Sequence, residues 1–86
     1  MIQKSIKIQL NGGLEARPIA MLVQVASQHE SSVYIETDGK KVNAKSIMGM
    51  MSLALYSGEA VTVITNGNYE QEAMKDMEEY LRGEKK

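Results

Sequence analysis

Cysteine is absent from this sequence, and histidine and proline each occur only once in its 86 residues. Without cysteine, the chain has no disulfide framework, no thiolate nucleophile and no cysteine metal site. One histidine does not by itself supply an ordinary set of zinc ligands. We therefore expect neither metal-dependent chemistry nor a cofactor.

The sequence also has little excess charge of either sign and no long apolar run. Its net charge is −1, and its 43% hydrophobic and 24% charged residues are ordinary for a globular chain. Because so small a net charge gives no general attraction to nucleic acid, partners must be recognised by local patches. Residues 1–5 lead into an alternating pattern, which predicts neither a signal peptide nor a membrane span, and we expect a cytoplasmic location.

The length of the chain suits one hydrophobic core, and we expect a single domain over residues 1–86. Apolar periodicity predicts the element order βαββαβα. The expected elements are a strand that ends before Asn11, a helix from Pro18 to about Ser27, strands at 33–36 and 41–43, a short helix after Ser46, a strand at 60–65 and a final helix from Asn68. This pattern predicts an α+β fold, an open-faced β-sandwich whose four-stranded antiparallel sheet is covered on one face by three helices.

Three local signals place the element boundaries. The Asp38–Gly39 pair supplies the positive φ angles of a tight hairpin turn. Ser46 is expected to cap a methionine-rich helix that Gly49 weakens, so this helix must depend on packing for its stability. Asn68 and Gln71 have the spacing of an N-cap and its N3 partner at the start of the final helix.

The segment from Gly13 to Pro18 forms a loop at the predicted start of the first helix. Free backbone N–H groups, the helix dipole and the Arg17 guanidinium together favour an anion there, which makes the loop a candidate phosphoryl site. The alternative is structural: Gly13 turns the chain, Pro18 begins the helix and Arg17 is solvated. The spacing alone does not decide between the two interpretations.

Residues 13–18 read Gly-Leu-Glu-Ala-Arg-Pro, and they resemble the active-site loop Gly-Leu-His-Ala-Arg-Pro of the HPr phosphocarrier family. Residues 43–53 resemble the regulatory-serine segment of the same family. The resemblance extends over the whole chain, because the family fold has the βαββαβα order read from the periodicity. It implies a protein in which a phosphoenolpyruvate-dependent enzyme phosphorylates the histidine, which passes the group to sugar-transporter components.

Glu15 stands where the family has its histidine. A neutral imidazole is a good nucleophile whose phosphoryl group is readily transferred, whereas a carboxylate would have to form a mixed anhydride. His29 does not replace it, because 14 residues of helical rise put it roughly 20 Å away. We expect His29 to be a helix-end residue, solvated or favoured by the dipole. The Crh-type branch of the family also lacks the histidine and keeps the serine segment, and the chain resembles that branch.

The resemblance implies that Ser46 is a regulatory phosphorylation site for an ATP-dependent HPr kinase/phosphorylase. The structural alternative is that Ser46 only caps its helix, worth about 1 kcal/mol, and both roles are compatible. The family's docking face corresponds here to Ala20, Gln24, Ile47, Met48 and Met51, and we expect Met48 and Met51 to be exposed. Arg17 and Lys45 are the expected cationic partners of an anion.

The function that this resemblance implies is a non-enzymatic regulator of carbon catabolite repression, whose phosphoserine docks onto a transcription factor of the catabolite control protein A type. A further hypothesis is that Glu15 beside Arg17 imitates phosphohistidine. The alternatives are a phosphocarrier of the sugar phosphotransferase system that uses Glu15 as its acceptor, a small phosphatase, and an interaction module for a metabolic enzyme. We expect a monomer or a weak dimer, because the hinge at 11–13 permits strand exchange without requiring it.

Overall fold

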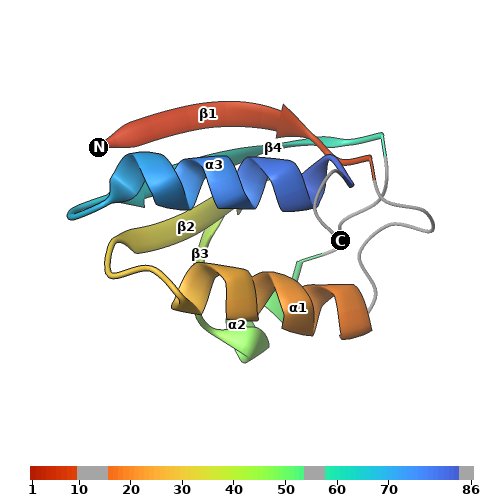
Figure 1. The fold of residues 1–86 in the computed structure, drawn as a ribbon. Helices are drawn as coiled ribbons and strands as arrows, with labels where there is room; N and C mark the ends of the chain where they lie inside the picture. Colours follow the sequence, from red (N-terminus) through yellow and green to blue (C-terminus); the bar gives the residue numbers. More distant parts are fainter. Residues whose placement is uncertain (10–15, 54–57, 84–86) are drawn as a thin grey trace.

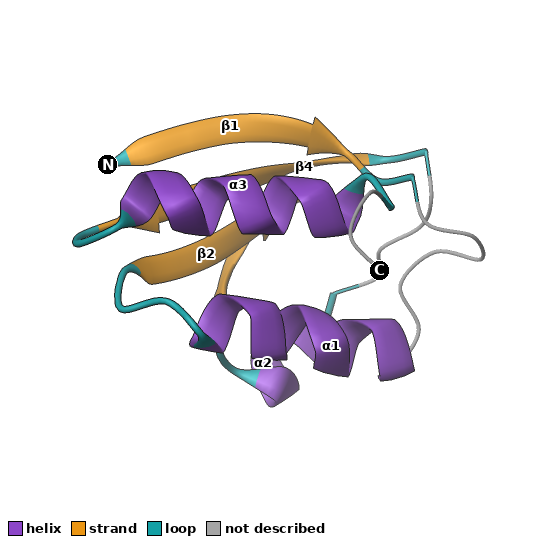
Figure 2. Ribbon diagram, viewed as in Figure 1, coloured by secondary structure: helices purple, strands orange, loops and turns teal. Residues whose placement is uncertain are grey.

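The computed structural model describes residues 1–9, 16–53 and 58–83 of the chain. Its elements are β1 (Ile2–Lys7), α1 (Ala16–Ser27), β2 (Ser32–Thr37), β3 (Lys40–Asn43), α2 (Ile47–Met51), β4 (Ala60–Asn66) and α3 (Glu70–Leu81), which Figure 2 colours by type. The predicted βαββαβα order is confirmed. Among the helices of the described residues, none is long and apolar enough to cross a bilayer.

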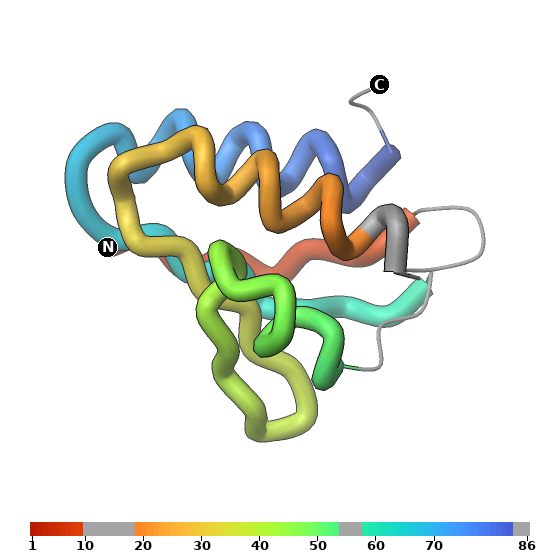
Figure 3. Tube along the Cα trace, turned by 90° about the horizontal axis from the view of Figure 1, so that it is seen from below, coloured from red at the N-terminus to blue at the C-terminus, as the bar shows by residue number. Residues whose placement is uncertain are grey.

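The four strands form one antiparallel sheet in the order β1-β4-β2-β3. In the register of the two inner strands, Val63 of β4 lies opposite Ile35 of β2. All three helices lie on one face of this sheet, with α1 and α3 side by side and α2 next to α1 (Figures 1 and 3). The predicted open-faced α+β arrangement is therefore confirmed.

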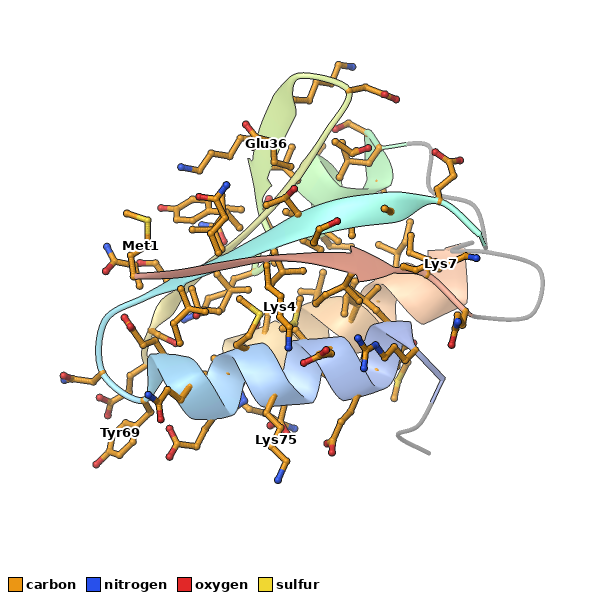
Figure 4. The ribbon with its side chains drawn as sticks, turned by 90° about the horizontal axis from the view of Figure 1, so that it is seen from above. Met1, Lys4, Lys7, Glu36, Tyr69 and Lys75 are labelled. Carbon is orange, nitrogen blue, oxygen red and sulfur yellow. The ribbon has the colours of Figure 1, made fainter. Side chains whose placement is uncertain are left out.

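The core lies between the sheet and the helices, because every second strand residue points to the helical side. Val33, Ile35 and Val63 have no exposed surface. The helices contribute the buried side chains of Leu22, Val25, Ala26, Met50, Ala73, Met74, Met77 and Leu81. The outer side of α3 is polar: Figure 4 shows Lys75 pointing away from the sheet, whereas Lys4 of β1 reaches towards α3, with its Nζ 2.9 Å from Glu78 Oε1.

The hairpin between β2 and β3 turns at Asp38 and Gly39, whose φ angles are 51° and 78°. Two successive residues with positive φ match the right-handed twist of the strands that they join, and Asp-Gly is a favoured pair for this purpose. Thr37 and Lys40 lie opposite each other at the ends of the two strands. The predicted turn is confirmed.

The first strand is shorter than its alternation indicated. β1 ends at Lys7, although Ile8 is still completely buried. Beyond the strand, the Ile8 N–H donates to the Glu59 carbonyl at 2.8 Å, and the Gly58 N–H donates to the Ile8 carbonyl at 2.7 Å. The predicted break at 11–13 lies outside the described residues.

The start of α3 differs from the prediction. Tyr69 is its N-cap, with a left-handed φ of 62° and no side-chain hydrogen bond to the helix, so the predicted Asn68–Gln71 cap is wrong. The Glu70 carboxylate holds this loop instead. Its Oε1 accepts the Gly67 N–H at 3.0 Å, and its Oε2 accepts the Met1 ammonium at 3.1 Å. One local contact, to Gly67, and one contact with the far end of the chain, to Met1, have therefore replaced the predicted cap.

Candidate functional site

Ser46 lies between β3 and α2 and is exposed. Its backbone is extended, with φ −106° and ψ 113°, and its Oγ accepts the Gly49 N–H at 3.3 Å. Upstream, Asn43 fixes the turn, because its carbonyl accepts the Ser46 N–H at 3.0 Å and its Oδ1 accepts the Lys45 N–H at 2.8 Å. The predicted role of Ser46 as N-cap is confirmed, and the residue is exposed.

α2 depends on packing for its stability, as expected for five residues that include a glycine. Met50 points inward and is completely buried, and Leu53 beyond the helix is 6% exposed. The remaining apolar side chains point outward: Ile47 is 43%, Met48 83% and Met51 55% exposed. The expected exposure of Met48 and Met51 is confirmed, and Met50 is core.

α1 packs against α2 and extends this apolar surface. Met21 on α1 is 46% exposed. Its neighbours on the expected docking face are Ala20, which is half-buried, and Gln24, which is exposed. We call Ala20, Met21, Gln24, Ile47, Met48 and Met51 together the α1–α2 face. In Figure 3 the two helices lie next to each other on the same side of the molecule.

Lys45 and His29 connect the Ser46 turn to the rest of the fold. Lys45 Nζ donates to the His29 carbonyl at 2.6 Å, and His29 Nε2 lies 2.7 Å from Asp76 Oδ2 on α3. The His29 side chain is only 12% exposed. His29 follows the end of α1 as predicted. Of the two environments expected for it, plain solvent exposure is wrong, and its pairing with α3 was missed because Asp76 is 47 residues away in the sequence.

The two site residues predicted in the loop before α1 are not placed by the structure. Glu15 lies outside the described residues, and so does the side chain of Arg17, whose backbone belongs to the first turn of α1. The geometry of the proposed phosphoryl loop therefore stays a prediction.

The described contacts of Ser46 include no group that would activate its hydroxyl. In the described part of the chain, its Oγ makes no hydrogen bond to a histidine, a carboxylate or an amine, and a serine nucleophile needs such a base to activate it. An external kinase supplies its own base. No three histidine, aspartate or glutamate residues gather into a possible metal site within the described ranges.

Comparison with known proteins connects this arrangement to one family. The family model described as the PTS HPr component phosphorylation site matches residues 2–83. The HPr-like protein Crh of Halalkalibacterium halodurans is 52% identical over 84 residues, which span 98% of this chain and 100% of that protein.

The chain is also similar to solved structures of HPr and Crh proteins. The phosphocarrier protein HPr of Bacillus anthracis superposes with a TM-score of 0.89 at 45% identity, covering 93% of this chain and 95% of that one. Crh of Bacillus subtilis, crystallised as an intertwined dimer with a swapping domain, gives a TM-score of 0.78 at 50% identity, covering 98% and 97%.

Proposed function

Because the chain belongs to the HPr family and is an HPr-like regulatory protein, we propose that its signal is the phosphorylation of Ser46 by an HPr kinase/phosphorylase. The observation that carries this proposal is an exposed serine hydroxyl directly beside exposed Ile47, Met48 and Met51. The γ-phosphoryl group of ATP passes to Ser46 Oγ, which loses its proton, while the bond to the bridging oxygen of ATP breaks and ADP leaves. The modified residue then carries about −2 charge next to an apolar surface. We propose that this phosphorylation takes place in the cytoplasm.

The partner that fits both features is a transcription factor of the catabolite control protein A type. An apolar pocket on the partner would cover Met48 and Met51, whose unbranched thioether side chains adapt to an uneven surface. A basic residue of the partner would pair with the phosphate through charge-assisted hydrogen bonds. Ala20 and Gln24 would extend the contact along α1, and Arg17 and Lys45 would lie at its charged side.

A phosphocarrier of the sugar phosphotransferase system is the second candidate, favoured by family membership alone. It requires Glu15 to form an acyl phosphate where the family uses histidine. To establish this candidate, labelled phosphate would have to pass from phosphoenolpyruvate to the chain. The label should be released by hydroxylamine, and the Glu15→Gln variant should not acquire it. Unchanged partner affinity in Glu15→Gln would remove the idea that Glu15 imitates phosphohistidine.

The proposed regulation is tested by incubating the protein with ATP and an HPr-type serine kinase, then measuring intact mass and mapping peptides. We expect one phosphoryl group, at Ser46. Ser52 is the internal control, because it is also exposed and lies at the other end of α2, where its Oγ donates to the Gly49 carbonyl at 2.6 Å. Ser46→Asn is the matched variant, since asparagine caps a helix as well as serine but offers no hydroxyl.

The result that contradicts the proposal is an unmodified chain under conditions that modify a histidine-bearing HPr in parallel. A pulldown with and without the phosphate then identifies the partner class. Retention of the transcription factor only by the phosphorylated form supports the proposed output, whereas retention of a metabolic enzyme alone replaces it. Sedimentation of both forms measures whether the chain is the expected monomer or a weak dimer.

A further inference from the structure

Methionine thioethers are the only sulfur atoms in this chain, which has seven methionines and no cysteine. The structure divides them into two groups. Met1, Met21, Met48 and Met51 are exposed by 46–83%, whereas Met50, Met74 and Met77 are 5% exposed or less. Three of the four exposed thioethers, those of Met21, Met48 and Met51, belong to the α1–α2 face.

The division is sharpest inside α2. Met48 is 83% exposed and Met51 55%, while Met50 between them is completely buried. Residues three apart lie on one side of a helix, so Met48 and Met51 share the outward side and Met50 faces the core. All three lie within four consecutive residues of the same helix. Accessibility is therefore the property that separates them, and accessibility controls the oxidation of a thioether.

We propose that Met48 and Met51, with Met21 on the neighbouring helix α1, are sites of reversible oxidation by peroxides, and that their oxidation blocks docking of the phosphorylated protein. The inference rests on the proposed function, because it concerns the same surface. The thioether sulfur attacks one oxygen of hydrogen peroxide, an S–O bond forms, the O–O bond breaks and water leaves. Sulfur is oxidised to a sulfoxide and the peroxide is reduced.

The reverse step returns the surface to its apolar state. A methionine sulfoxide reductase removes the oxygen as water while two thiols become a disulfide, so the thioether is restored. This chain supplies neither thiol, since it has no cysteine. The absence of cysteine also means that no thiolate within the chain is oxidised before the methionines.

The effect of oxidation on docking follows from polarity. A sulfoxide oxygen is a strong hydrogen-bond acceptor, and the apolar pocket proposed for the partner offers it no donor. Burying even one such group lowers affinity on the order of tenfold or more. Because Ser46 itself has no sulfur, peroxide leaves its phosphate in place. Oxidation therefore prevents docking although the protein stays phosphorylated.

The first test is the pattern of oxidation in the folded protein. The protein is treated briefly with hydrogen peroxide, quenched, digested and mapped by mass spectrometry. We expect sulfoxides at Met1, Met21, Met48 and Met51, with Met50 unmodified although it is flanked by reactive neighbours. Oxidation of Met50 as fast as Met48, without unfolding, would overturn the assignment, and so would an unmodified Met48.

The second test measures binding of Ser46-phosphorylated protein to a catabolite control protein A-type transcription factor before and after peroxide. We expect affinity to fall about tenfold or more and to return after treatment with methionine sulfoxide reductase and thiol. The matched control is a variant with Met21→Leu, Met48→Leu and Met51→Leu. It still oxidises at Met1, which precedes β1, whereas α2 packs against β3 at the opposite edge of the sheet. This variant should bind equally before and after peroxide.

A converse variant, Met48→Gln with Met51→Gln, places permanent polar groups at the same positions and should bind weakly without any peroxide. If the untreated phosphorylated protein fails to bind the factor, the proposed function fails, and this inference fails with it. If the untreated protein binds and the oxidised protein binds equally well, only the inference is overturned.

Discussion

α2 has three methionines and α3 has two, and the two helices use them differently. α3 has 12 residues, and its Met74 and Met77 are buried against the sheet. α2 has five residues, of which only Met50 is buried, while Met48 and Met51 face outward. A long amphipathic helix uses its whole apolar stripe for the fold, whereas a helix of little more than one turn anchors through one residue and leaves apolar area for a partner.

The two helices also begin in different ways. α2 begins at Ser46, whose Oγ accepts the Gly49 N–H three residues ahead. α3 begins at Tyr69 in a left-handed conformation, and the Glu70 carboxylate ties the preceding loop to the Met1 ammonium. The cap of α2 is thus a neutral local contact, while the start of α3 is held by a carboxylate that has one local contact and one ionic contact with a distant part of the chain.

The largest predicted effect separates the two uses of methionine. Met77→Ala should lower the free energy of unfolding by about 2–5 kcal/mol, because it leaves a cavity in the core. Met48→Ala should change it by no more than about 0.5 kcal/mol, because that side chain is exposed. Met50→Ala is the control within α2 and should resemble Met77→Ala. Urea unfolding measures the free energy of unfolding of all three variants. A large loss for Met48→Ala would contradict the proposed difference between exposed and buried methionines.

A second prediction concerns how α3 is connected to α1. His29→Ala removes the ring that contacts Asp76 Oδ2 but keeps the carbonyl that accepts Lys45 Nζ. We expect a loss of about 1–2 kcal/mol in the free energy of unfolding, the range of a partly buried hydrogen bond to a charged group.

A double-mutant cycle of His29→Ala with Asp76→Asn isolates this pair from the other contacts of Asp76. A coupling free energy near zero would show that the two side chains contribute nothing to each other. Partner binding through the α1–α2 face should be unchanged in His29→Ala, since the variant leaves Met48 and Met51 in place.

A third prediction compares the two helix starts directly. Ser46→Ala should cost about 1 kcal/mol of folding free energy, because it removes the side chain that caps α2. Asn68→Ala should cost almost nothing, because Asn68 does not cap α3. Thermal or urea unfolding of both variants measures the difference. Equal losses would mean that Asn68 caps α3 in solution, as its spacing from Gln71 had indicated.

Much of the fold was predictable from the sequence because the deciding signals are local. The alternation of Ile6 and Ile8, the Asp38–Gly39 turn and the Ser46 cap each depend on residues within a few positions of one another. The start of α3 was predictable only in part. The Glu70 carboxylate accepts the Gly67 N–H three residues back, which is a local contact, but it also contacts an ammonium 69 residues away in the sequence.

In the candidate site, too, the features with a local sequence signal were predictable and the others were not. Ser46 was identified as a cap from its own neighbours, but five residues are too few for periodicity to decide which of Met48, Met50 and Met51 points inward. The expected exposure of Met48 and Met51 came from the family resemblance, and the structure supports it through their exposed fractions of 83% and 55%. The contact between His29 and Asp76 had no local signal at all.

The smallest predicted effect is a dependence on pH that belongs to α3 and not to α2. The Gly67 N–H, and after it the Met1 ammonium, lower the pKa of the Glu70 carboxyl below its ordinary value. A carboxyl whose pKa is depressed by folding stabilises the native state above its unfolded pKa. This contribution is lost as the pH falls through the folded-state pKa, because the protonated carboxyl no longer attracts the ammonium.

Glu70→Gln is the matched variant for this prediction, since glutamine keeps the shape of the side chain and does not titrate. Unfolding free energies of both proteins are measured from about pH 6 to about pH 2, which brackets the ordinary titration of a carboxyl. The difference between the proteins should be largest at the upper end and should shrink on acidification. A difference that stays constant would mean that the Glu70 charge does not stabilise the start of α3. The Ser46 hydroxyl carries no charge in this range, so the cost of Ser46→Ala should not change as Glu70 is protonated.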